Sequence, residues 1–175
     1  MLSKKIQTAL NNQVAEEVST SHYYLSMASW CDMSGLHGSA KYLYQQSESE
    51  RMHMMKLFHY VNDAGGHALA PAVKQPVHEF KALPAVFELV LEHETHVTKT
   101  INALVAACVD EKDYSTFNFL QWYVAEQHEE ERQLKLILDL MKVAGVEGRG
   151  IFFIDKEIGK MADAAQIASG EKSSS

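Results

Sequence analysis

Acidic residues interrupt the apolar stripe of four long helical segments, and each interruption falls near the middle of its segment. The apolar residues recur with the period of an α-helix, so each acid shares the face that a core would bury. The four acids are Glu17, Glu50, Glu94 and Glu130. A single glutamate on a helix is ordinarily solvated. Four at matching depth, in helices that pack together, form a pattern that chance explains poorly.

Two further polar residues accompany these acids. His53 follows Glu50 by one helical turn, and Gln127 precedes Glu130 by one turn. Buried carboxylates without partners are unfavourable by several kcal/mol, and the stripes hold no basic residues. A pair of divalent cations would turn the repulsion among four carboxylates into attraction. The pattern therefore predicts a two-metal centre in the core.

The donor atoms indicate which metal fits. Carboxylate oxygens with one imidazole suit manganese or iron better than zinc, and no thiolate is offered. Glu50 is the natural bridging ligand, because His53 beside it would fix one of the two metals. Two adjacent Fe²⁺ ions can deliver two electrons to one O₂, so we expect oxidation of iron or of another substrate.

The elements that must position these residues are helices. We expect long helices over about residues 3–33, 37–64, 83–110 and 115–144, and a shorter amphipathic helix over about 151–165. Two of the three prolines lie in the one long connection, residues 66–82. The predicted fold is all-α: an antiparallel four-helix bundle with one long crossover loop and a short fifth C-terminal helix. Residues 1–167 form one domain, and 168–175 are expected to be a disordered tail.

Composition narrows the class of protein. The chain has 175 residues, 46% of them hydrophobic, and a net charge of −7, which argues against nucleic-acid binding and suits the collection of cations. Cys31 and Cys108 form no CxxC pair, which favours buried free thiols in a reducing compartment over a disulfide. The N-terminal residues lack the apolar run of a secretory signal, and no segment reaches the length of a membrane span. We therefore expect a cytoplasmic protein with no membrane partner.

Specific stretches carry a family resemblance. They are Glu17 with Tyr24, the run Glu50-Arg51-Met52-His53, the pair His93-Glu94, and FNFLQWYVAEQHEEE at 117–131. With these motifs the chain resembles the bacterial non-haem ferritins over about residues 1–165. The resemblance implies a homo-oligomeric shell of 24 subunits that oxidises Fe²⁺ with O₂ and stores it as ferric oxyhydroxide mineral.

The resemblance also implies roles for single residues. Glu17, Glu50 and His53 match the first iron site; Glu50, Glu94 and Glu130 match the second, with Gln127 beside it. Tyr24 matches a tyrosine next to the centre that serves as one-electron donor or hydrogen-bond partner. Glu126, Glu129 and Glu130 match three of the four glutamates of a third iron site, and Ser49 stands at the fourth position.

At other positions the sequence differs from related families. These differences concern whether the protein binds haem and where iron enters. Arg51 occupies the position of the haem-ligating methionine of bacterioferritins, so we expect no haem. Animal ferritins line an iron channel with acids whose positions match Phe117 and Leu120, which leaves the entry route open here.

Three alternative functions fit the sequence less well. A di-iron peroxidase of the rubrerythrin kind lacks its CxxC pairs here. A catalytically inactive shell subunit with a salt-bridged interior lacks basic residues on the stripes. A smaller DNA-protecting mini-ferritin fits poorly with the fifth helix and with metal ligands within one subunit.

Overall fold

The structure is a computed structural model that describes residues 2–172, with side chains described for residues 2–166. It contains five helices and, within the described residues, no strand. Their bounds are α1 Lys4–Met33, α2 His37–Asp63, α3 Leu83–Asp110, α4 Tyr114–Ala144 and α5 Arg149–Lys172. The all-α prediction is confirmed, and the four long helices begin and end within a residue or so of the expected positions.

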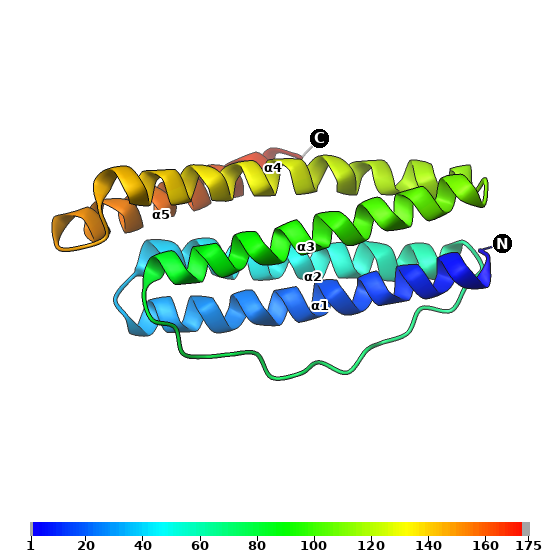
Figure 1. Ribbon diagram of the computed structural model, residues 1–175, viewed down its shortest axis with the longest axis horizontal. Coiled ribbons are helices and arrows are strands. Elements are labelled where there is room, and N and C mark those ends of the chain that lie inside the picture. Colours follow the sequence, from blue (N-terminus) through cyan, green and yellow to red (C-terminus); the bar gives the residue numbers. More distant parts are fainter. Residues whose placement is uncertain (1, 173–175) are drawn as a thin grey trace.

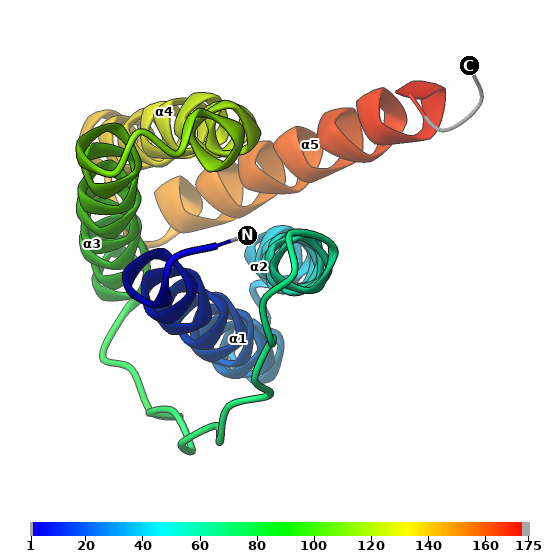
Figure 2. The same cartoon turned by 90° about the vertical axis from the view of Figure 1, so that its right-hand side faces the viewer.

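The four long helices lie along one another, and α5 packs against α2 and α4 near one end of the bundle (Figures 1 and 2). Short connections make α1 antiparallel to α2 and α3 antiparallel to α4. The connection between α2 and α3 runs the whole length of the bundle, so α2 and α3 point the same way (Figure 1). This is the single long crossover expected for a ferritin-like bundle.

The crossover follows the outer side of α1 and is held there by hydrogen bonds. Asn11 accepts from the backbone N–H of Leu69 at 2.8 Å, and Ser26 donates to the carbonyl of Val77 at 2.7 Å. Asn11 and Ser26 lie near opposite ends of α1. The loop therefore crosses the bundle in an extended conformation and leaves the bundle interior to the helices.

Local sequence sets the helix ends. The side chain of Ser3 accepts from the N–H of Ile6 at 3.2 Å, and Asp113 accepts from the N–H of Thr116 at 3.0 Å, which caps α1 and α4. Pro84 lies in the first turn of α3, where it loses no helical hydrogen bond. Gly65 follows α2 with φ of +78°, a conformation that glycine adopts without strain.

The apolar core consists of two clusters separated by a polar layer. One cluster contains Leu43, Phe87, Leu134 and Ile154, and the other contains Leu10, Leu57, Ile101 and Leu120. On every long helix the mid-helix acid falls between a residue of one cluster and a residue of the other. On α3, for example, Glu94 lies between Val90 and Val97. The bundle therefore places its four acids in one layer.

Helix α5 is longer than expected. We expected it to end near residue 165, but it continues through residues 166–172. The Ala-rich run ADAAQIAS offers good helix formers and no proline, so nothing in it stops the helix. Residues 168–172, assigned from the sequence to the tail, are helical. The rest of that predicted tail, residues 173–175, lies outside the described part of the chain.

The contact between α5 and α2 depends on one acid and one glycine. Asp155 accepts hydrogen bonds from the N–H groups of Gly38 at 3.0 Å and Ser39 at 2.8 Å, so it caps α2 from another helix. A Cβ atom at Gly38 would lie 1.9 Å from the carbonyl oxygen of Asp155. Only glycine allows this approach.

The structure also shows the state of the two cysteines and the apolar character of the helices. Cys31 and Cys108 are buried and free, as predicted. Across residues 2–172, none of the helices combines the length and apolar character that crossing a membrane would require.

Candidate metal centre

Four glutamates, one from each long helix, meet in the polar layer between the two apolar clusters. Glu17, Glu50, Glu94 and Glu130 are 0%, 2%, 2% and 5% exposed. Each is buried because it takes a position on its helix that an apolar residue would otherwise fill. The prediction that these acids face the core is confirmed.

The carboxylates and His53 form groups of potential metal ligands. In each group the ligand atoms lie within 4.8 Å of one another. The groups are Glu17, Glu50 and His53; Glu50, Glu94 and Glu130; and His53, Glu126 and Glu130. Glu50 belongs to the first two groups, so one carboxylate is shared between them.

The first group is organised by residues of α1, α2 and α3. Nδ1 of His53 lies 3.2 Å from Oε2 of Glu50 and 3.9 Å from Oε2 of Glu17. The amide Nε2 of Gln13 donates to Oε1 of Glu17 at 2.5 Å, and Thr100 donates to Oε1 of Gln13 at 2.9 Å. Gln13 thereby leaves the other oxygen of Glu17 facing His53.

The second group is organised around Glu94. The hydroxyl of Tyr24 donates to Oε1 of Glu94, and Nε2 of Gln127 donates to Oε2 at 3.0 Å. Tyr24 is fully buried and Gln127 is 1% exposed. Both residues were predicted beside the centre, and the structure places both in direct contact with one of its carboxylates.

The electrostatics of this layer favour cations. None of the described lysines and arginines is buried. One oxygen of each of three carboxylates is buried without a hydrogen-bond partner: Oε2 of Glu17, Oε1 of Glu50 and Oε2 of Glu130. Such orphan acceptors are costly unless something positive binds them. Divalent cations with oxygen-rich coordination fit this donor set.

Burial also shifts the proton equilibria of the ligands. Burial raises the pKa of Glu17 to about 7, and hydrogen bonds from its neighbours oppose that rise only in part. Burial, followed by repulsion from Glu130 and Glu17, holds the pKa of Glu50 well above its ordinary value. Burial, followed by repulsion from the nearby Lys56 ammonium, lowers the pKa of His53 to about 4. His53 is thus neutral at pH 7 and able to ligate a metal.

The two further acids expected at a third iron site behave differently. Glu126 is exposed and lies within the group formed with His53 and Glu130. Glu129 belongs to none of the three groups and forms a bidentate ion pair with Arg132 at 2.6 and 2.8 Å. Ser49, at the fourth position, has its hydroxyl 3.5 Å from Nε2 of His53.

Sequence reasoning missed two buried residues that support the centre. Gln13 was overlooked, although it precedes Glu17 by four residues and so shares its helix face. Tyr123 precedes Gln127 by the same interval; its ring stacks on Trp122 at 4.7 Å and tilts against His53 at 5.5 Å. The spacing could have identified both, but a polar or aromatic residue on a core stripe is not in itself a sign of a site.

Comparisons with known proteins agree with this geometry. The family described as ferritin-like domain matches residues 7–144. A probable bacterial non-heme ferritin-like protein of Haemophilus influenzae is 46% identical over 165 residues, covering 94% of this chain and all of the relative. A bacterial non-heme ferritin of Campylobacter jejuni is 44% identical over 162 residues, covering 93% and 97%.

The chain belongs to the bacterial non-haem ferritin family. The fold agrees with this assignment. A crystal structure described as an open pore ferritin from the archaeon Archaeoglobus fulgidus superposes on this ferritin with a TM-score of 0.88 at 43% identity, covering 90% of this chain and 96% of the other. The predicted family and the predicted four-helix bundle with a fifth helix are both confirmed.

Proposed function

We propose that this chain is a cytoplasmic iron-storage ferritin subunit with ferroxidase activity. It binds two Fe²⁺ ions inside its own helical bundle, oxidises them with O₂, and stores the product as ferric oxyhydroxide in a shell of 24 copies. The observation that carries the proposal is the pair of buried ligand groups that share Glu50. The free, buried thiols of Cys31 and Cys108 suit a reducing compartment.

The two ligand groups define the two iron positions. The first ion takes Glu17, Glu50 and His53, and the second takes Glu50, Glu94 and Glu130. A bridging carboxylate holds two metals at the separation of about 3.5–4 Å that two-metal centres use. Two adjacent Fe²⁺ ions supply two electrons to one O₂. The names of the bacterial non-heme ferritin relatives agree with iron as the substrate.

The chain's own side chains prepare the site. The raised pKa of Glu17, near 7, means that ion binding releases a proton from this carboxyl at neutral pH. His53 is already neutral and ligates without losing a proton. Gln127 and the Tyr24 hydroxyl fix the orientation of Glu94 through its two oxygens. Tyr24 is also close enough to serve as a one-electron donor.

A third iron position is also part of the proposal. Glu126 and Glu130 face His53, so two carboxylates and one imidazole meet there. Glu129 could join them only after leaving its ion pair with Arg132. We expect this third position to bind iron more weakly than the first two, because Ser49 contributes no charge.

Two measurements test the proposal. Light scattering of the purified protein gives the mass of the shell, and we expect 24 subunits rather than the 12 of a mini-ferritin. Iron loading in air compares the wild type with Glu50→Ala. A catalytically inactive shell subunit would load iron equally in both, whereas a ferroxidase loses its fast loading in the variant.

We expect no haem, because Arg51 is exposed and paired with Glu48.

A further inference from the structure

A pocket of about 280 Å³ opens between α3 and α4 beside the metal centre. Polar residues that line it include Thr98 and Asn102 on α3 and Gln127, His128 and Glu131 on α4. Asn102 and His128 are exposed, whereas Gln127 is 1% exposed. The pocket therefore runs from the surface to a side chain of the buried layer.

Gln127 connects the pocket with the carboxylates. Its Nε2 donates to Oε2 of Glu94 at 3.0 Å, so the inner wall of the pocket is one side chain away from a proposed iron ligand. Its Oε1 is buried and has no hydrogen-bond partner. An amide oxygen without a partner is a suitable ligand for a hard divalent cation.

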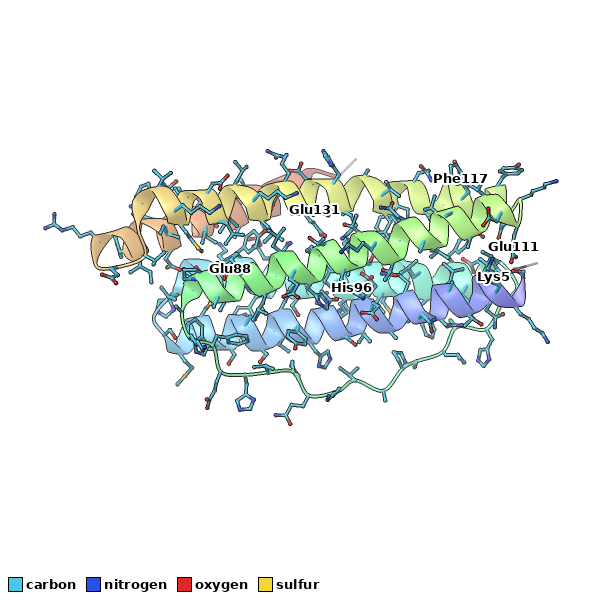
Figure 3. The ribbon with its side chains drawn as sticks, viewed as in Figure 1. Lys5, Glu88, His96, Glu111, Phe117 and Glu131 are labelled. Atoms are coloured by element: carbon cyan, nitrogen blue, oxygen red, sulfur yellow. The ribbon has the colours of Figure 1, made fainter. Side chains whose placement is uncertain are left out.

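The outer part of the pocket supplies a carboxylate. Glu131 lies on the side of α4 that faces α3, and its Oε1 accepts from the hydroxyl of Thr98 at 2.8 Å (Figure 3). The same hydroxyl lies 3.4 Å from Nε2 of Gln127. Glu131, Thr98, Gln127 and Glu94 thus form a continuous polar series from the partly exposed edge of the bundle to the centre. Ile101 and Val124 line the pocket beside this series.

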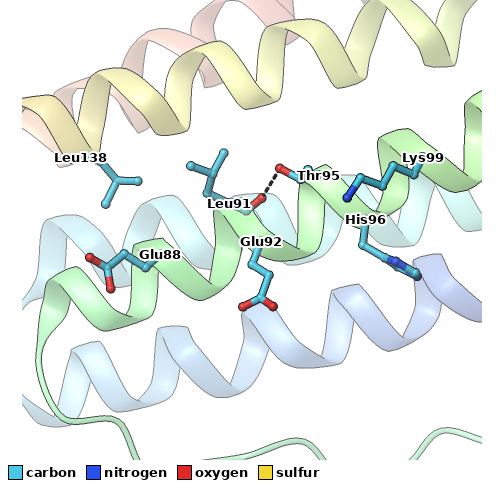
Figure 4. A pocket seen from close by; sticks show the side chains of 7 residues that line it. All are labelled: Glu88, Leu91, Glu92, Thr95, His96, Lys99 and Leu138. Atoms are coloured by element: carbon cyan, nitrogen blue, oxygen red, sulfur yellow. Dashed lines mark hydrogen bonds between the residues drawn. The ribbon is translucent and has the colours of Figure 1, made fainter.

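A neighbouring pocket between the same helices lacks these features. It measures about 470 Å³ and is lined by Glu88, Leu91, Thr95, His96 and Leu138, among others (Figure 4). None of the residues that line it belongs to a ligand group of the centre or hydrogen bonds to Glu94. This neighbouring pocket also lies between α3 and α4, but none of its side chains leads to the centre.

We propose that Fe²⁺ reaches the metal centre through the pocket between Thr98, Gln127 and Glu131. The ion binds first at the mouth to the His128 imidazole and to the Glu131 carboxylate, whose Oε2 must release its ion pair with Lys135 at 2.9 Å. It then passes to the amide oxygen of Gln127 and from there to Glu94. This inference rests on the proposed function, since it concerns how the same centre receives its substrate.

The test is the rate at which a redox-inactive cation enters the centre. Co²⁺ is mixed rapidly with the metal-free protein without oxygen, and its visible absorption is followed as it binds. Asn102→Trp fills the exposed rim of the pocket and leaves every ligand of the proposed centre unchanged. We expect the rate of binding to fall at least tenfold, while the number of ions bound per chain at equilibrium stays the same.

A matched control and a second variant complete the experiment. His96→Trp places the same bulky side chain at an exposed position of the neighbouring pocket on the same helix, and we expect the wild-type rate. Glu131→Gln keeps the shape but removes the charge, and we expect a severalfold slower rate. Wild-type rates in both Asn102→Trp and Glu131→Gln would overturn the proposed route. Absence of Co²⁺ binding in the wild type would instead reject the centre itself.

Discussion

Nδ1 of His53 lies 3.2 Å from Oε2 of Glu50, one turn away on the same helix. In the proposed centre the two side chains would bind the same metal ion, yet they are not equivalent. Glu50 belongs to both groups of the two-metal centre, whereas His53 belongs to only one of these two. Removing each side chain in turn should therefore affect metal binding to different extents.

Replacing these residues by alanine tests that difference. His53→Ala should retain the group of Glu50, Glu94 and Glu130 and bind one tight divalent ion per chain. Glu50→Ala should bind none tightly, because both groups lose their shared ligand. Equilibrium dialysis of the metal-free proteins against Co²⁺ without oxygen measures both numbers. Met52→Ala, which alters a side chain 55% exposed on the same helix, should bind as the wild type does. Equal loss in His53→Ala and Glu50→Ala would contradict the bridging role.

The hydroxyl of Tyr24 should stabilise the metal-free protein more than the loaded one. Tyr24→Phe leaves Oε1 of Glu94 buried without its donor, which should lower the free energy of unfolding by about 1–3 kcal/mol. A bound metal satisfies the same carboxylate, so the loss should shrink when Zn²⁺ is present. Thermal unfolding with and without Zn²⁺ measures this. Tyr44→Phe removes only a weak, exposed hydrogen bond of 3.5 Å and serves as control. An equal loss in both metal states would argue against Glu94 as a ligand.

The raised pKa of Glu17 predicts a pH dependence of stability. Its ordinary value is 4.5 and its value in the fold is about 7, so the folded metal-free chain binds this proton more tightly than the unfolded chain does. The resulting stabilisation is fully present below pH 4.5 and is lost as the pH rises to about 7. Its size is roughly 3–4 kcal/mol, since each pKa unit corresponds to about 1.4 kcal/mol.

Glu17→Gln isolates this contribution. The variant has no titrating group at this position, while the opposing contribution of His53 is common to both proteins. We therefore expect the variant to gain stability relative to the wild type between pH 4.5 and 7, with no further gain above that range. Melting temperatures of the two metal-free proteins, taken across pH 5 to 8.5, give the difference. A difference that does not vary with pH would show that Glu17 is ionised in the fold throughout.

The contact between α5 and α2 should contribute to stability without affecting metal binding. Asp155→Ala removes three hydrogen bonds, two to backbone N–H groups at the start of α2 and one from the Ser39 hydroxyl. We expect a loss of about 1–3 kcal/mol in the free energy of unfolding and an unchanged number of metal ions per chain. Asp163→Ala breaks an exposed ion pair with Lys41 on the same two helices and should cost less than about 1 kcal/mol. Similar losses in both variants would contradict the capping role of Asp155.

Much of the fold follows from the sequence because the helices are long and regularly patterned. Ser3, Pro84 and Gly65 mark helix ends by chemistry that acts within a few residues. The end of α5 could not be predicted, since the Ala-rich run contains no residue that marks where a helix stops. The cap that Asp155 provides for α2 also did not follow, because the two partners are more than a hundred residues apart.

Some residues of the candidate metal centre could be predicted from the sequence and others could not. Glu17, Glu50, Glu94 and Glu130 could be predicted because each breaks an apolar stripe at the same depth. Thr98 could not, since its role depends on the carboxylate of Glu131, which it meets across two helices. Glu129 was expected at a third iron site, yet the structure pairs it with Arg132 one turn away and leaves it outside the three ligand groups.

The most direct test of the two-metal centre is an aerobic titration of the metal-free protein with Fe²⁺, following the fast phase of oxidation. We expect this phase to saturate at about two irons per chain, as a two-metal centre requires, and to disappear in Glu50→Ala. Saturation near three would mean that the position formed by His53, Glu126 and Glu130 takes part in the fast reaction. A wild-type protein with no fast phase would contradict the proposed ferroxidase activity and leave an inert shell subunit in its place.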